Sequence, residues 1–106
     1  MVKQILTRAG FVENETFKET RFYKAPRTTY AVYNDSFERR GADDINLITD
    51  HDMTIELYSY APDPEAEKRI ETALDFYGIP FEKQERYWHN EEGHYQTIYT
   101  FSYISK

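Results

Sequence analysis

Residues 53–79 read MTIELYSYAPDPEAEKRIETALDFYGI, and this stretch decides the fold because a strand pattern runs directly into a helix pattern. The first part alternates apolar residues with polar or half-polar ones. A period of two is typical of a strand with one face buried and the other exposed. The residues expected on the buried face are Met53, Ile55 and Leu57.

The second part predicts a helix over residues 64–77. Asp63 is a good N-cap, and Pro64 suits the first helical position, where its missing N–H costs no hydrogen bond. Gly78 is expected to end the helix in a left-handed conformation, which lets Ile79 pack back on the last turn. The apolar stripe that should face the sheet comprises Ala66, Ile70, Ala73, Leu74 and Tyr77.

Acidic residues on this helix recur every four positions, at Glu67, Glu71 and Asp75. Such spacing places them on one side of the helix, with Lys68 and Arg69 nearby to reduce the repulsion. We interpret them as a solvated acidic stripe, because an acid–base pair would need a concave apolar pocket that no motif indicates.

The rest of the chain supplies further strand patterns around a shorter helix. We expect a helix over 2–9, a loop over 12–16, strands over 17–23, 28–33, 45–59, 81–89 and 94–104, an exposed charged loop over 34–44, and a turn over 90–93 that joins the last two strands. The stretch 45–59 should consist of two strand segments, 45–49 and 53–59, with a kink at residues 50–52, where strand propensity is poor and a bulge or tight turn is expected. The predicted fold class is α+β, in the order α-β-β-β-α-β-β, with two helices packed on a mainly antiparallel sheet.

Composition restricts the function. A chain of 106 residues suits one domain, here 1–106, and its aromatic content of 17%, with ten tyrosines, favours a sheet with amphipathic surfaces for partners. The absence of cysteine excludes disulfides and cysteine nucleophiles. A net charge of −6 disfavours nucleic acid as a partner. No apolar run approaches the roughly 20 residues that cross a bilayer, so no membrane partner is expected.

No motif for phosphate binding, dinucleotide binding or hydrolysis occurs, so we expect neither an enzyme nor a cofactor. Residues 50–52 read Asp-His-Asp, but neighbours in a strand point to opposite faces, and a solvated turn is the favoured interpretation. His89 and His94 flank the predicted turn. A zinc site with Glu91 or Glu92 would lack a fourth ligand, so no metal is expected.

Five short stretches follow one another in an order that resembles a family of small minor structural proteins from phages and prophages of Gram-positive bacteria. The order of all five carries the resemblance, since no single stretch is diagnostic. A strand at 29–34 is also similar to that family's pattern, although Thr29 stands where the pattern has proline. The five stretches are Ala42-Asp43, Ile55 to Tyr58, Asp63 to Glu67, Ile79 to Lys83 and Tyr95 to Phe101.

The resemblance implies a tail-completion or tail-terminator role. Such a subunit forms a ring, commonly a hexamer, that caps the tail tube and joins it to the head connector. The expected partners are therefore the tail tube protein, the head connector proteins and further copies of the chain. The expected location is the virion, after assembly in the host cytoplasm. A closed ring needs two different patches on each subunit, and the candidate contact residues from the aromatic strands and the charged loop are Tyr30, Tyr33, Phe37, Arg39 and Arg40.

Three alternatives stay open at this point. The chain could be a head-side connector or stopper subunit of the virion, which would contact DNA or the portal. It could instead be a prophage-encoded regulator that binds a host protein. A small enzyme of unfamiliar type is the third alternative, and the absence of catalytic motifs disfavours it.

Overall fold

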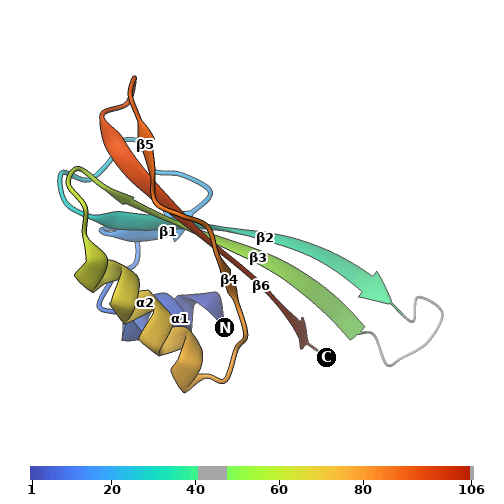
Figure 1. Cartoon of the computed structure of the whole chain (residues 1–106). Helices are drawn as coiled ribbons and strands as arrows, with labels where there is room; N and C mark the ends of the chain where they lie inside the picture. The colour runs from blue at the N-terminus through green and yellow to red at the C-terminus, as the bar shows by residue number, and fades with distance from the viewer. Residues whose placement is uncertain (41–47, 106) are drawn as a thin grey trace.

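The computed structural model describes the backbone of residues 1–40 and 48–105, and the side chains of residues 1–36 and 51–103. The described residues form two helices and six strands, which Figure 1 labels. Their bounds are α1 (Val2–Arg8), β1 (Phe17–Glu19), β2 (Tyr30–Arg40), β3 (Ile48–Ser59), α2 (Pro64–Phe76), β4 (Glu82–Lys83), β5 (Tyr87–His89) and β6 (His94–Ser105).

The strands form one sheet in the order β1-β2-β3-β6-β4, and β5 also pairs with β6. All pairs are antiparallel except β1 with β2, which is parallel. The predicted α+β class is therefore confirmed. The predicted element order is wrong by one strand, because residues 81–89 do not form a continuous strand. Within this stretch Gln84 still donates a backbone hydrogen bond to Ile98, but pairing then stops until β5.

Both helices lie on one face of the sheet, where they cover its left-hand half in Figure 1. This face and the helices share one apolar core, which confirms the alternation predicted for β3 and the stripe predicted for α2. Burial of a large aliphatic side chain stabilises the fold by about 1.5–3 kcal/mol. The largest fully buried side chains are Tyr99, Phe17, Ile5, Leu6, Met53, Ile55, Leu57, Ile70 and Leu74.

The ends of α2 are as predicted. The Asp63 carboxylate accepts a hydrogen bond from the backbone N–H of Ala66 at 3.0 Å, and a second from the Thr29 hydroxyl at 2.7 Å. Gly78 has a φ of +68°, and the N–H of Ile79 donates to the carbonyl of Leu74. The cap therefore fixes α2 to the segment that precedes β2 as well as satisfying its own first turn.

Three further strands depart from the prediction. Residues 34–40 continue β2 instead of forming a loop, and β3 runs through residues 50–52 without a kink. In both places the strand is paired along its whole length, and pairing overrides poor intrinsic strand propensity. By contrast β1 ends at Glu19, because Thr20 has a φ of +67° and turns the chain away.

Candidate functional site

The sheet extends well beyond the helices, as Figure 1 shows at its right-hand side. We call this three-stranded extension the arm; it comprises residues 34–40 of β2, 48–52 of β3 and 102–105 of β6. Its strands pair with one another, and in Figure 1 neither helix lies over it. Within the arm, Tyr103 is partly buried and packs against the apolar core.

His51 is an ordered part of the arm, which corrects the expected solvated turn at 50–52. Its Nδ1 lies 2.9 Å from Asp35 Oδ2, and its ring stacks on Tyr103 with centroids 4.4 Å apart and planes 4° from parallel. These contacts join all three strands of the arm. Burial and the neighbouring Asp35 charge raise the pKa of the Tyr103 hydroxyl above its ordinary value.

The opposite end of the sheet carries exposed aromatic rings on the hairpin of β5 and β6. Tyr87 is 63% exposed and Trp88 is 42% exposed. The Trp88 ring lies 4.8 Å from that of Tyr95 across the strand pair, which holds the indole in place. Large aromatic side chains held rigidly at the surface are the residues that most often anchor protein interfaces. We call this set, Tyr87, Trp88 and Tyr95, the aromatic hairpin.

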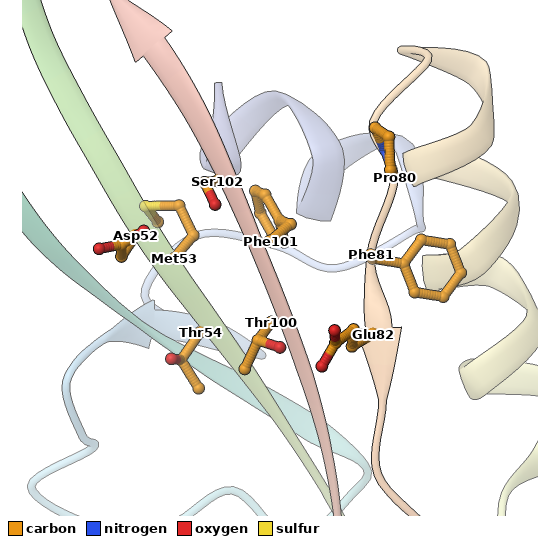
Figure 2. A pocket seen from close by; sticks show the side chains of 9 residues that line it. All are labelled: Asp52, Met53, Thr54, Pro80, Phe81, Glu82, Thr100, Phe101 and Ser102. Atoms are coloured by element: carbon orange, nitrogen blue, oxygen red, sulfur yellow. The ribbon is translucent and has the colours of Figure 1, made fainter.

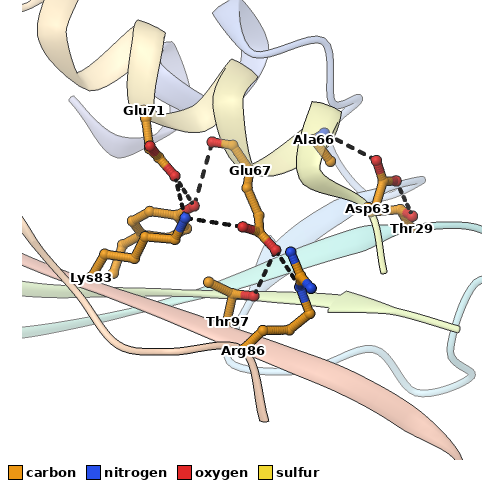
Figure 3. A network of polar contacts seen from close by, with 9 residues as sticks. Thr29, Asp63, Ala66, Glu67, Glu71, Lys83, Arg86 and Thr97 are labelled. Atoms are coloured by element: carbon orange, nitrogen blue, oxygen red, sulfur yellow. Dashed lines mark hydrogen bonds and ion pairs between the residues drawn. The ribbon is translucent and has the colours of Figure 1, made fainter. Parts of the chain in front are cut away.

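A network of polar contacts joins α2 to the strands below it (Figure 3). Glu67 is only 6% exposed, so the predicted solvated stripe is wrong at this position. Its Oε2 accepts a hydrogen bond from Arg86 Nε at 2.7 Å, and its Oε1 accepts one from Lys83 Nζ at 3.0 Å. Thr97 Oγ1 lies 3.3 Å from Oε2 and donates a third. A buried carboxylate is stable only with such partners.

Glu71 extends this network by one helical turn. Lys83 Nζ lies 2.8 Å from Glu71 Oε2, and the Tyr99 hydroxyl donates to the same oxygen at 2.8 Å. Burial would raise the pKa of Glu67, but hydrogen bonds from Arg86 and Lys83 outweigh it and hold the pKa below its ordinary value. Burial and the Glu71 carboxylate raise the pKa of Tyr99, so it remains a neutral donor. Only Asp75 of the predicted stripe is exposed.

The sheet face away from the helices holds a second network. Gln96 Nε2 donates to Glu56 Oε1 at 2.6 Å and to the Tyr58 hydroxyl at 2.9 Å, while Asn34 Nδ2 donates to Glu56 Oε2 at 3.2 Å. His89 Nε2 lies 2.6 Å from Gln96 Oε1. A pocket of about 290 Å³ adjoins it, lined in part by Phe22, Tyr30, Tyr58, His94 and Gln96.

The two histidines of the hairpin face each other, as their spacing predicted. His89 and His94 are directly opposite across β5 and β6, with ring centroids 5.4 Å apart. Burial and the neighbouring His89 lower the pKa of His94. Among residues 1–36 and 51–103, no group of three or more histidine, aspartate or glutamate side chains is placed to hold a metal ion.

A further pocket, of about 650 Å³, lies at the edge of the sheet between β6 and residues 80–82 (Figure 2). Its apolar part comes from Met53, Phe81 and Phe101. Asp52 and Glu82 are the titratable residues among its lining, and they carry the same charge. The hydroxyl side chains of Thr54, Thr100 and Ser102 complete the polar part of its lining.

The predicted contact residues fall into two groups. Tyr30 and Tyr33 are buried within the chain, where Tyr30 stacks on Tyr58 with centroids 5.2 Å apart, so they offer a partner little side-chain surface. Phe37, Arg39 and Arg40 lie on β2 rather than in a loop, and their side chains lie outside the described part of the structure. The segments 42–43 and 45–47 also lie outside it.

No family model matches the chain, and no curated protein matches it. In the part of the chain that the structure describes, no helix combines the length and the apolar character needed to cross a membrane.

Proposed function

We propose that the chain is a minor structural protein of a long-tailed phage, which completes the tail by capping the tail tube and joining it to the head connector. It acts as a ring of identical copies and has no catalytic activity. It is assembled in the host cytoplasm and ends in the virion. The observation that supports this role best is the shape of one sheet that presents two chemically different ends.

The two ends are separated along β6. Tyr95 near the start of this strand belongs to the aromatic hairpin, and Ser105 at its end belongs to the arm. The molecule is elongated, with extents of 49 × 28 × 23 Å. A single hydrogen-bonded strand through both surfaces keeps them at a fixed separation. A subunit that joins two different assemblies needs that geometry, because each end must reach its own partner.

The polar network supports a structural role for the charged residues at the centre. Both oxygens of Glu67 are engaged by cations, and Lys83 bridges Glu67 to Glu71. A general acid or base needs a free proton site facing a substrate. Here the charges instead bind the segment between β4 and β5 to α2 (Figure 3).

Immunogold electron microscopy tests the proposal directly. Antibody against the chain should label intact virions at the junction of head and tail, and should label the connector end of isolated tails. Label confined to isolated heads would support a head-side connector or stopper instead. Absence of label from virions, with the protein present in the lysate, would contradict a structural role and favour a protein that binds a host factor.

A further inference from the structure

Both edges of the sheet are covered by short strands near the helices and left open farther along. On one edge β1 pairs with β2 as far as Tyr33. On the other edge β4 pairs with β6 at Tyr99 and Thr100. Tyr33 and Tyr99 both lie opposite Ile55 of β3, in one row across the sheet. The two edges therefore become open at nearly the same level.

The chain geometry explains why the covering strands stop. After Thr20 donates its N–H to the carbonyl of Tyr33, its left-handed φ of +67° carries the chain away from β2. On the other edge Pro80 lies two residues before β4, and it has no N–H to donate to a neighbouring strand. Among the described residues no strand pairs with the outer edge of 34–40 in β2, or with that of 101–105 in β6.

The open edge of β6 lacks the features that normally protect a strand from pairing. Residues 101–105 read Phe-Ser-Tyr-Ile-Ser, without a charge, a proline or a glycine. Natural sheets block such edges with charges, proline or bulges, because unpaired N–H and C=O groups recruit another strand. The pocket of about 650 Å³ lies beside this edge and offers space for the side chains of an added strand (Figure 2).

Strand direction indicates which strand fits. Since β2 and β6 are both antiparallel to β3, they run in the same direction. A second copy in the same orientation therefore brings its β2 alongside β6 as a parallel pair. The levels also match, since Ser36 of β2 and Ser102 of β6 both lie opposite Asp52. Because the two edges differ, this contact is heterologous, and its repetition gives a ring if the rotation closes.

We propose that the open β6 edge beyond Thr100 binds the open β2 edge beyond Tyr33 of a second copy, so that the sheet continues from copy to copy. Repetition of this contact would build the ring that the proposed tail-completion role requires. Only the closure of the ring, and not the contact itself, rests on the proposed function. Every copy then contributes one edge to each of two neighbours.

Engineered cysteines test the contact, because the chain has no cysteine of its own. Ser36 and Ser102 are exposed and lie two strand spacings apart within one copy, roughly 9–10 Å, which is too far for a disulfide. In a parallel pair between copies they become neighbours. Mild oxidation of concentrated Ser36→Cys/Ser102→Cys protein should give a ladder of dimers, trimers and larger species on a denaturing gel. A second pair, Asn34→Cys/Ser102→Cys, covers a register shift of two residues.

The single variants give the direction of the contact. Ser36→Cys alone and Ser102→Cys alone should stay monomeric, and their equimolar mixture should give dimers and nothing larger. Dimers from either single variant would show pairing of identical edges and overturn the proposal. So would the absence of a ladder from both double variants. The control for random collision is Ser36→Cys/Thr72→Cys, with the second cysteine on the exposed side of α2, and circular dichroism checks that each variant is folded.

This result is separable from that of the tail-completion role. A cross-linked ladder from a protein that virions do not contain would keep the contact and reject the role. Virions that carry the protein at the junction, with no ladder from either double variant, would keep the role and reject the contact.

Discussion

Arg86 Nε lies 2.7 Å from Glu67 Oε2, so a residue between the two short edge strands is bonded to the middle of α2. Lys83, at the end of β4, contacts the other oxygen of the same carboxylate. Within the stretch 81–89, which was predicted to be one strand, Lys83 and Arg86 thus both bond to Glu67 of α2. This attachment fixes the chain directly before Tyr87, the first residue of the aromatic hairpin.

Glu67→Gln should lower the free energy of unfolding by about 1.5–3 kcal/mol, the usual worth of hydrogen bonds to a charged group. The amide keeps the size of the side chain but removes the charge that Arg86 and Lys83 neutralise. Asp75→Asn is the matched control, since Asp75 is exposed on the same helix, and its effect should stay within about 0.5 kcal/mol. Urea unfolding followed by circular dichroism measures both, and equal effects would show that Glu67 is solvated.

Stability should fall in acid through the same carboxylate. The pKa of Glu67 is lowered in the folded state, so it contributes stability above the pKa of the unfolded chain, near 4.5. That contribution disappears as the pH drops from there through the lowered folded pKa. Unfolding free energies at pH 7, 5, 4 and 3 should therefore decline less steeply for Glu67→Gln than for the native chain. Parallel declines would place the acid-sensitive group elsewhere, for example at Asp63, whose pKa is lowered as well.

Gly78→Ala should cost about 1–2 kcal/mol, because a φ of +68° is unfavourable for a residue with a Cβ. A Cβ at this position would meet no atom within 4 Å, so the cost is conformational rather than steric. Gly78→Asn should cost less, since asparagine tolerates the left-handed region. Thermal unfolding of the three proteins checks the order. Equal melting temperatures for alanine and asparagine would mean that the backbone relaxes there.

Trp88→Ala should weaken binding to the tail or connector partner by about 2 kcal/mol or more, roughly 30-fold, as expected for an anchoring aromatic. The fold should lose at most about 0.5–1.5 kcal/mol from the ring contact with Tyr95. Tyr23→Ala is the control, because Tyr23 is 96% exposed on a loop. The chain has a single tryptophan, so a shift of its fluorescence on binding to the partner is a direct readout. Unchanged emission and affinity would remove the aromatic hairpin from the interface.

Local signals in the sequence were sufficient for α2 and its ends. Asp63, Gly78 and the apolar stripe act through neighbours within a few residues, so one sequence contains the whole interaction. The same holds for β6 and the turn before it. The position of Glu67 was also detectable, since it lies three residues before Ile70 and seven before Leu74, which is the spacing of one helix face.

The arm was not predictable in the same way. Residues 34–40 are rich in turn-forming and charged residues, and they are a strand because β3 pairs with them residue by residue. The parallel pairing of β1 with β2 likewise depends on where the chain returns after Thr20. Such pairings join residues far apart in the sequence. For this reason Tyr30 and Tyr33 were predicted to contact a partner, although both are buried within the chain.

The central claim is tested most directly by electron microscopy of lysates from a mutant phage in which the gene for this chain is inactivated. The account predicts full heads that lack tails, together with unattached tails of irregular length, and recovery of normal particles when the native chain is supplied from a plasmid. Normal, infectious virions from this mutant phage would contradict the tail-completion role.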